Sequence, residues 1–176
     1  DMGFKIFCSY GKGYAITQSE EYKKVIIKSA QTLCTRFNKK VGSIKSWDNR
    51  TKWDFPVIID NMMNLELLFE ASKMTGDDSF KKIAIQHANT TLKNHFRKDN
   101  SCFHVLGYDA ITGQVISKNT HQGYSDDSAW ARGQAWAVYG FTMAYRYTND
   151  NAYLKQAEAT AQFFINHKNM PKDGIP

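Results

Sequence analysis

The sequence has no long hydrophobic run and few prolines. No apolar stretch approaches the roughly 20 residues of a membrane-spanning helix, so we predict no membrane partner. Only 3 of the 176 residues are proline, whereas 14% are aromatic. This composition argues against disorder and favours a packed helical protein. The chain opens Asp1-Met2-Gly3-Phe4 without the basic and then apolar stretch of a signal peptide, which is consistent with a mature end or an incomplete chain.

Cysteine and histidine are too sparse and too scattered for a metal site. The 3 cysteines, Cys8, Cys34 and Cys102, form neither a CxxC pair nor a zinc pattern, and the 5 histidines include no HExxH motif. Zinc and calcium sites need ligands clustered at short, regular spacings. We therefore predict reduced, mostly buried thiols and a protein that uses neither a metal nor another cofactor.

Positive charge is in excess but is not concentrated. The formal net charge is +6, and the lysines follow helix faces, as at 23–28 and 81–82, without forming a basic block. A solvated helix face explains such lysines, so no nucleic-acid partner is predicted. The overall bias still favours an anionic ligand.

The sequence does contain a repeated turn. Thr17, Thr75 and Thr148 are each followed by an aromatic residue at the fifth position, Lys at the seventh and a small or aliphatic residue at the ninth. The three threonines are 58 and 73 residues apart, spacings that suit one helical hairpin with its connections. Each turn is predicted to cap a new helix, and the candidate N-caps are Ser19, Asp77 or Asp78, and Asp150.

Helical periodicity lies on both sides of each turn. Segments 22–37, 80–92 and 153–164 are amphipathic, whereas 62–74 and 130–147 are apolar on nearly every face and are predicted to be buried helices. Hairpins of one buried and one amphipathic helix close into a toroid. The predicted fold class is therefore all-α, with inner and outer helices.

Two segments break the helical pattern. Residues 101–108 and 114–118 are predicted to pair as a small β-hairpin near 101–118, the only sheet of the fold. Residues 40–56 are predicted to form a loop that carries Trp47 and Trp53. Exposed Trp in a loop often binds carbohydrate, although ordinary packing explains such residues equally well.

The toroid places charged residues near its mouth. Asp1, Asp60 and Arg132 lie 15 or 16 residues before the repeat threonines, at equivalent places near the start of an inner helix. An Asp at a helix start is often only a cap. Asp60, however, follows the apolar run 55–59, and a carboxyl group in such surroundings tends to have a raised pKa, which suits a proton donor. We expect all three side chains to point into one cavity.

Residues 121–136 are the most informative stretch. They combine two Trp, an Arg, a His, two Gln and two Asp with two Gly. Aromatic rings can cover the apolar face of a sugar, and Arg can bind a carboxylate through two hydrogen bonds. The alternative interpretation is a helix start capped by Asp126 or Ser128, with Trp130 and Trp136 in the core. The combination of residues favours a site for an acidic sugar.

Four stretches are informative together: Trp53-Asp-Phe-Pro-Val-Ile-Ile-Asp60-Asn-Met-Met, the repeat turns, Phe103-His104 through Tyr108-Asp109, and His121 to Trp136. In these stretches the chain resembles the unsaturated glucuronyl hydrolases of glycoside hydrolase family 88. The resemblance implies an (α/α)6 barrel of six hairpins without a metal. Because the chain holds about three hairpins, we expect residues 1–176 to be a single domain and a central fragment of such a barrel. We expect a bacterial protein of the cytoplasm or periplasm.

The resemblance also implies a reaction and a set of residues. The family acts on oligosaccharides with a 4,5-unsaturated glucuronic acid at the non-reducing end, and it hydrates the C4=C5 vinyl ether instead of displacing at the anomeric carbon. Asp60 matches the general acid and base, and Asp1 matches the second essential Asp. The matching substrate-binding positions are Trp47, His104, Gln122, Arg132 and Trp136.

Two alternatives remain open. The unsaturated rhamnogalacturonyl hydrolases, a related barrel, use the same hydration chemistry on pectin fragments, although the 121–136 stretch favours the glucuronyl enzyme. A non-catalytic glycan-binding helical repeat protein is the other. Such a scaffold would favour apolar residues at the inner-helix starts, where this chain has charged ones.

Overall fold

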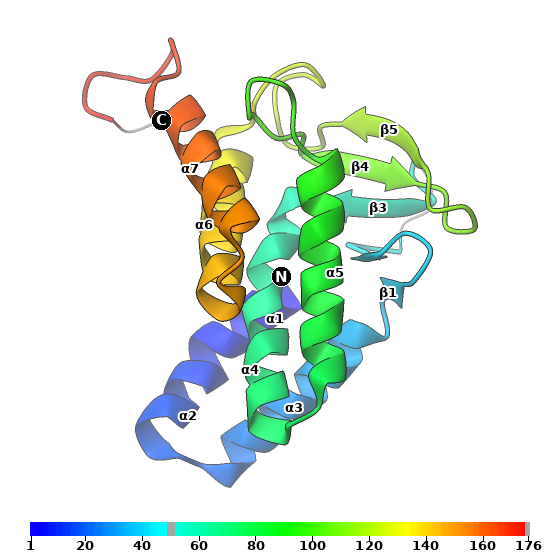
Figure 1. Ribbon diagram of the computed structural model, residues 1–176, viewed down its shortest axis with the longest axis vertical. Coiled ribbons are helices and arrows are strands. Elements are labelled where there is room, and N and C mark those ends of the chain that lie inside the picture. The colour runs from blue at the N-terminus through cyan, green and yellow to red at the C-terminus, as the bar shows by residue number, and fades with distance from the viewer. Residues whose placement is uncertain (49–51, 175–176) are drawn as a thin grey trace.

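The computed structural model describes residues 1–48 and 52–174, which form a mostly helical structure with small sheets at one end (Figure 1). The helical elements are α1 (Met2–Ile6), the π-helix η1 (Phe7–Gly11), α2 (Lys12–Thr17), α3 (Glu20–Cys34), the 3₁₀ helix η2 (Ile59–Asn64), α4 (Leu65–Thr75), α5 (Asp78–Asn94), α6 (Ala131–Thr148) and α7 (Asn151–Ile165). The strands are β1 (Phe37–Asn38), β2 (Ser43–Ile44), β3 (Phe55–Ile58), β4 (Val105–Tyr108) and β5 (Val115–Asn119). Within the described ranges, no helix is long and apolar enough to cross a membrane.

The three predicted turns each join two helices through the same hydrogen bonds. The hydroxyls of Thr17, Thr75 and Thr148 donate to the carbonyl four residues earlier at 2.7–2.8 Å and accept the N–H two residues later at 3.1–3.2 Å. The residue that follows each Thr is left-handed, with φ of 55°, 74° and 56°. The α2–α3, α4–α5 and α6–α7 turns lie at the ends of their helices that point away from the β3–β4–β5 sheet (Figure 1). The predicted helical hairpins are therefore confirmed.

Two of the predicted N-caps are confirmed. The carboxylates of Asp77 and Asp150 accept the N–H two residues later at 2.8 and 2.9 Å. Ser19 occupies the N-cap position of α3, but its side chain caps no described N–H group. Asp78 is the first residue of α5 and not its cap. Thr17 instead holds the backbone of Ser19, so the turn begins α3 without a Ser cap.

The predicted β-hairpin is confirmed, but the prediction that it is the only sheet was wrong. β4 and β5 pair antiparallel as expected, but β3 adds a third strand, with Phe55 opposite Tyr108 and Ile58 opposite Val105. β1 and β2 form a second, two-residue ladder. Residues 43–44 and 55–56 therefore belong to strands and not to the predicted loop, and residues 49–51 of that loop lie outside the described residues. A four-residue apolar run has no period of its own, so only its pairing with β4 identifies it as a strand.

The thiols are less buried than predicted. Cys102 is buried and Cys34 is half-buried, but Cys8 is exposed on η1, and all three are free. Burial raises the pKa of Cys102 to about 12 and that of Cys34 to about 11, so both are kept as neutral thiols.

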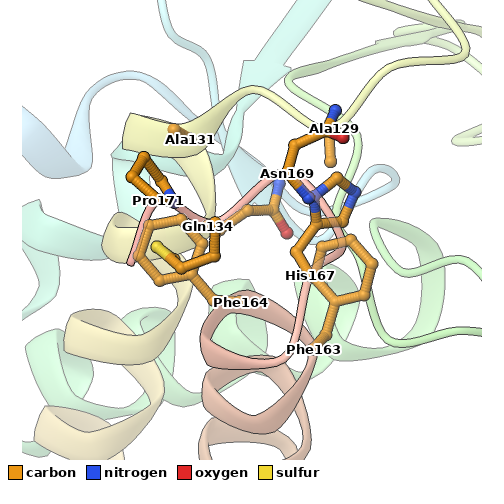
Figure 2. A pocket seen from close by; sticks show the side chains of 9 residues that line it. Ala129, Ala131, Gln134, Phe163, Phe164, His167, Asn169 and Pro171 are labelled. Atoms are coloured by element: carbon orange, nitrogen blue, oxygen red, sulfur yellow. The ribbon is translucent and has the colours of Figure 1, made fainter. Parts of the chain in front are cut away.

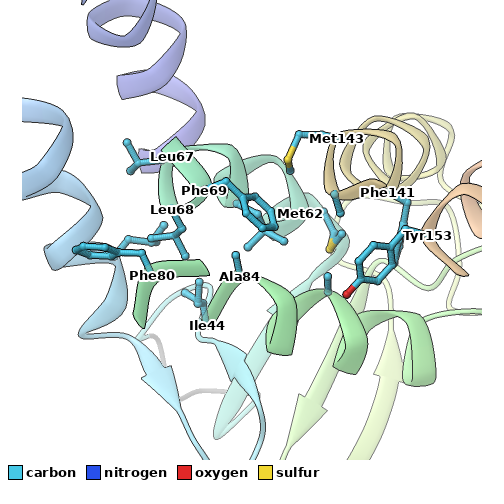
Figure 3. Close-up of a cluster of buried hydrophobic side chains, with 14 of the residues drawn as sticks. Ile44, Met62, Leu67, Leu68, Phe69, Phe80, Ala84, Phe141, Met143 and Tyr153 are labelled. Carbon is cyan, nitrogen blue, oxygen red and sulfur yellow. The ribbon is translucent and has the colours of Figure 1, made fainter. Parts of the chain in front are cut away.

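The main core lies between the inner helical segments and α5. Met62 of η2 and Phe69 of α4 pack with Phe141 of α6, and Tyr153 of α7 closes the cluster from the far side (Figure 3). Gly140 lies where α6 crosses η2, because a Cβ atom there would overlap the Met62 side chain. The buried character predicted for 62–74 and 130–147 is thus confirmed, and the crossing of α6 over η2 brings their starts together.

Two buried histidines join α5 to the strands. His87 Nδ1 accepts the Ile44 N–H at 3.0 Å, and His95 Nε2 donates to the Val57 carbonyl at 3.2 Å. Both side chains are fully buried. Burial lowers the pKa of His87 to about 3 and that of His95 to about 4, so both rings are neutral in the folded protein.

The protein is therefore expected to lose stability in mild acid. Below pH 6.5 the unfolded chain protonates these histidines while the folded chain does not, so the free energy of unfolding falls by about 1.4 kcal/mol per pH unit for each ring. The loss should run from about pH 6.5 down to about pH 4, and further for His87. Denaturant midpoints across this range should show a shallower pH slope in His87→Asn, whose side-chain oxygen can still accept the Ile44 N–H. An unchanged slope would contradict the assignment.

Candidate active site

Asp60 lies at the junction of strand β3 and helix η2, where the chain leaves the sheet. The N–H of the preceding residue, Ile59, donates to the His104 carbonyl at 3.0 Å, so the β3–β4 ladder fixes the place where η2 begins. Asp60 is only 8% exposed, and its Oδ2 atom has no hydrogen-bond partner within the described part of the chain. Burial raises the pKa of the carboxyl group, although its own N–H and Arg132 act in the opposite direction.

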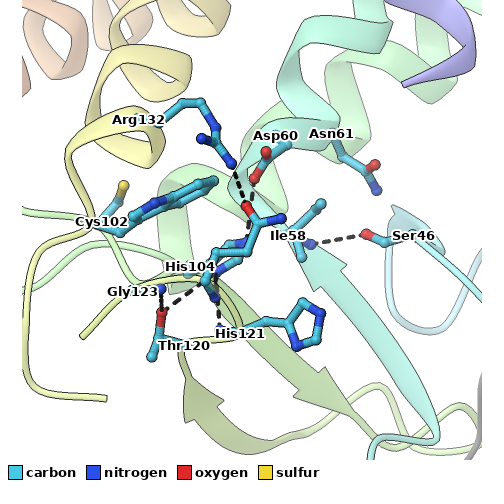
Figure 4. A network of polar contacts seen from close by, with 12 residues as sticks. Ser46, Ile58, Asp60, Asn61, Cys102, His104, Thr120, His121, Gly123 and Arg132 are labelled. Carbon is cyan, nitrogen blue, oxygen red and sulfur yellow. Dashed lines mark hydrogen bonds and ion pairs between the residues drawn. The ribbon is translucent and has the colours of Figure 1, made fainter. Parts of the chain in front are cut away.

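His104 faces Asp60 in a defined protonation state. Its Nδ1 atom accepts the N–H of His121 at 3.0 Å and that of Gln122 at 3.3 Å. A neutral ring that accepts at Nδ1 carries its proton on Nε2, and Nε2 lies 3.6 Å from Asp60 Oδ2 (Figure 4). Burial, and then the charges of His121 and Arg132, lower the pKa of His104 to about 4. The ring is therefore neutral and points an N–H group toward the buried carboxyl.

Gln122, Trp130 and Arg132 form the next layer of the site. The Arg132 guanidinium donates to Gln122 Oε1 at 2.6 Å and lies over the Trp130 ring, 4.4 Å from its centroid. The Trp130 ring also packs on His104, with centroids 4.2 Å apart. Arg132 is at the start of α6, so the crossing of α6 over η2 brings this cation close enough to act on Asp60.

An aromatic wall lies on the other side of His104. The Trp47 ring is 5.8 Å from His121 and 5.7 Å from Trp53, and the His121 ring is 6.4 Å from that of His104. Trp53 is buried and donates its indole N–H to Asn119 Oδ1 at 2.9 Å. Trp47 is half-buried and so remains available to a ligand.

Asp1 lies beside η2, but its carboxylate is exposed. The N–H of Phe4 donates to Asn64 Oδ1 at 3.3 Å, which joins α1 to η2. Asp1 also lines a cavity of about 110 Å³ with Asn61, the neighbour of Asp60. No contact among the described residues joins the Asp1 carboxylate to Asp60 or Arg132, so their sharing of one cavity stays a prediction.

Trp136 is the predicted site residue that stands apart. It lies one turn after Arg132 on α6, and its ring packs edge-on against Phe4 of α1 at 5.6 Å. Its indole N–H is buried and has no partner among the residues described. Trp136 therefore bridges α6 and α1, on the side of the site where Asp1 lies.

The alternative interpretation of 121–136 was right that a helix starts there, since α6 begins at Ala131, but wrong about its caps. Trp130 holds the N-cap position of α6 without a side-chain cap. Asp126 instead accepts the Thr120 N–H, and Ser128 bonds with Ser125 inside the loop. This loop, residues 120–130, turns the N–H groups of His121 and Gln122 toward His104.

The sequence did not indicate that His121 and Trp130 lie against His104, or that Trp53 lies against His121. Two of them lie in the 121–136 stretch, so composition indicated the region but not their partners. Trp53 reaches His121 because β3, which follows Trp53, pairs with β4.

Two further hollows lie near α6. A cavity of about 660 Å³ is lined by Gln122 and Trp130, with the fully exposed Tyr124 at its edge. A smaller one of about 230 Å³ lies between α6 and the segment after α7, and its lining includes Gln134, Phe163, Phe164 and Pro171 (Figure 2). The smaller hollow is mainly apolar and contains no carboxyl group among its lining residues.

The described residues contain no group of three or more His, Cys, Asp or Glu side chains close enough to hold a metal ion. The Asp60 cluster offers a proton donor, a neutral imidazole, a guanidinium and aromatic rings. Such a set can transfer a proton to a bound anionic sugar.

The chain is similar in sequence to unsaturated glucuronyl hydrolases and unsaturated chondroitin disaccharide hydrolases. It is 62% identical over 178 residues to an unsaturated glucuronyl hydrolase of Formosa agariphila, covering 100% of this chain and 44% of that protein. It is 38% identical over 176 residues to an unsaturated chondroitin disaccharide hydrolase of Streptococcus pneumoniae, covering 99% and 44%. The crystal structure of an unsaturated glucuronyl hydrolase specific for heparin superposes with a TM-score of 0.96 at 50% identity, covering 99% of this chain and 47% of that one.

The chain thus spans less than half the length of the relatives it matches. The model of Glycosyl Hydrolase Family 88 matches residues 3–167. That match includes Asp60, His104 and Arg132 and nearly the whole chain. The chain therefore belongs to Glycosyl Hydrolase Family 88.

Proposed function

We propose that this protein hydrolyses oligosaccharides that end in a 4,5-unsaturated glucuronic acid, by hydration of the C4=C5 vinyl ether. The observation that carries the proposal is the buried Asp60 carboxyl, whose Oδ2 atom has no hydrogen-bond partner among described residues and lies 3.6 Å from Nε2 of neutral His104. A carboxyl group with a raised pKa keeps its proton to higher pH and is a better proton donor. The names of the relatives support the substrate class.

In the proposed reaction, Asp60 donates its proton to C4. The electron pair of the double bond forms the C4–H bond, and positive charge develops at C5 and the ring oxygen. Water then adds at C5 and returns a proton to the Asp60 carboxylate. The resulting hemiketal opens, and the bond to the next sugar is lost. His104 stabilises the transient carboxylate because its Nε2 proton already points at Asp60.

The other residues are proposed to hold the substrate. Arg132 binds the uronate carboxylate, and its plane is fixed by Gln122 on one edge and Trp130 beneath. Trp47 supplies an apolar surface for a sugar ring. Asp1 and Trp136 are proposed to complete the site from the α1 side.

We also propose that residues 1–176 are one part of an (α/α)6 barrel. The three helical hairpins, with their turns at one end and the Asp60 cluster at the other, support this arrangement. The 44% coverage of the Formosa relative is consistent with it.

The test uses the protein expressed from its whole open reading frame. Unsaturated chondroitin, heparin and rhamnogalacturonan disaccharides are each supplied, and loss of the vinyl-ether absorbance is followed. Turnover of the glucuronate-containing disaccharides is expected. Binding without loss of absorbance would indicate a non-catalytic glycan-binding protein, and a preference for the rhamnogalacturonan product would favour the rhamnogalacturonyl hydrolase alternative.

Arg132→Ala should raise KM more than it lowers kcat. The side chain binds the anionic group equally in the ground state and in the transition state. Its loss therefore weakens substrate binding without changing the barrier of the chemical step. A charge-assisted hydrogen bond is worth about 1.5–3 kcal/mol, which corresponds to a fall in kcat/KM of about 10- to 100-fold. Arg146→Ala, an exposed arginine on the same helix, is the matched control. A loss confined to kcat would place Arg132 in the chemical step instead.

A further inference from the structure

Arg97 lies between α5 and β4, behind the site, and its guanidinium joins two segments that are distant in the sequence. Nη1 donates to Ser101 Oγ and to the Cys102 carbonyl, each at 3.2 Å. Nη2 donates to the Asp126 carbonyl at 2.8 Å and to the Ser128 carbonyl at 3.3 Å. The planar group also lies 3.8 Å from the centroid of the Phe103 ring.

The two outer acceptors belong to the 120–130 loop. This loop carries the N–H groups of His121 and Gln122 that bond to His104 Nδ1. Its own side-chain bonds, such as those of Asp126 to Thr120, tie the loop to itself. Arg97 is the side chain that ties its carbonyls to the segment before β4.

At Cys102, the Arg97 contact is joined by a residue from α6. The Cys102 carbonyl that Arg97 contacts also accepts Gln134 Nε2 at 3.1 Å, and the Cys102 N–H donates to Gln134 Oε1 at 2.9 Å. Gln134 is only 1% exposed and comes from α6. The loop, the start of α6 and the strand that follows His104 therefore meet at Cys102, two residues before His104.

We propose that Arg97 is a positioning residue: by holding the Asp126 and Ser128 carbonyls next to Cys102, it keeps the loop N–H groups on His104 Nδ1 and so directs the Nε2 proton to Asp60. Its consequence for catalysis rests on the proposed function. A guanidinium serves this purpose because its fork bonds to acceptors on two sides at once, whereas the compact ammonium of Lys cannot.

Loosening the loop should change the titration of His104. Without its two N–H donors, Nδ1 becomes free to bind a proton, and the pKa of His104 should rise toward its usual value. The charged or titratable groups that face the ring are Asp60 on η2, His121 on the loop, Arg132 on α6 and His95 at the C-cap of α5. Of these, Asp60 favours the protonated ring when its carboxyl group is ionised, whereas Arg132 and His121 oppose it and buried His95 stays neutral.

The experiment compares Arg97→Lys with wild type in the protein from the whole open reading frame, with exposed Arg146→Lys as the control. Misplacing a site by about 1 Å can cost about 10²-fold in rate, so kcat/KM should fall by about 10- to 100-fold. The pH profile of kcat/KM in Arg97→Lys should also gain an ionisation between two limits. These are about pH 4, the pKa of His104 when the loop holds it, and about pH 6.5, the usual pKa of histidine. Arg97→Ala should recover part of the activity in added guanidinium ion.

Two measurements do not depend on turnover. Amide hydrogen exchange should increase in residues 120–130 and stay unchanged in α4 and α6. Ring nitrogen NMR with labelled histidine, assigned through His104→Gln, should show the Nε2-protonated form in wild type and a raised His104 pKa in Arg97→Lys. A wild-type protein without turnover would refute the proposed function, while these two readouts would still decide the role of Arg97. Unchanged loop exchange, or an activity loss with the His104 titration unchanged, would overturn the proposal.

Discussion

Asp60→Asn should abolish turnover of an unsaturated uronide while substrate binding is largely kept. Asn has nearly the same shape and can still accept or donate a hydrogen bond, but it can neither protonate C4 nor take a proton from water. General acid–base catalysis is worth about 10²–10⁴ in rate, and here one group serves both steps. Steady-state kinetics should show the loss in kcat, and calorimetric titration with the unsaturated disaccharide should show a dissociation constant near that of wild type.

The matched control is Asp78→Asn, which changes an exposed carboxylate in the first turn of α5. It should leave kcat unchanged. If Asp60→Asn kept more than roughly a tenth of the wild-type kcat, the loss would be well below the usual contribution of acid–base catalysis. Asp60 would then not be the proton donor, and Asp1 would become the leading candidate, to be tested as Asp1→Asn.

Gly3→Ala should damage both stability and activity, because α1 crosses η2 at this residue. An added Cβ would lie 2.6 Å from the Asn64 carbonyl oxygen and 2.8 Å from its Cα. These are backbone atoms and cannot rotate away. α1 must move off η2, which breaks the hydrogen bond from the Phe4 N–H to Asn64 and moves Asp1 away from Asp60. We expect a loss of about 1–3 kcal/mol in stability and about 10- to 100-fold in kcat.

Gly13→Ala is the control for this change. It adds the same methyl group to α2, where the new atom would meet only the side chain of Tyr22. Thermal unfolding and steady-state kinetics of both variants separate the two effects. If Gly3→Ala kept the wild-type kcat despite lower stability, the position of Asp1 relative to Asp60 would not matter to the reaction.

The local structure was predictable because its causes lie close together in the sequence. The threonine turns rest on bonds that span two to four residues, so Thr75 bonds only to Ala71 and Asp77. The buried and amphipathic helices follow from side-chain spacing alone. The candidate site could be located for the same reason, since Asp60 and Arg132 stand at fixed distances from those turns.

The partners of the site residues were decided only by the tertiary structure. β3 became a strand through its pairing with β4, because an apolar run of four residues fits a strand or a loop equally well. The same pairing brought Trp53 near His121. Trp136, which composition grouped with the sugar site, packs instead on Phe4, more than 130 positions away in the sequence.

The sequence by itself determined which segments are helices, where they turn, and which residue types gather at one end of them. The protonation state of His104 was left to the fold, since it depends on N–H groups 17 and 18 residues away. The raised pKa of Asp60 depends likewise on the burial of its carboxyl group in the folded chain. The hydrogen bonds of helices and turns join residues within one helical turn, so they can be predicted from the sequence. Desolvation of a carboxyl group and the choice of a histidine tautomer arise only when distant segments pack together.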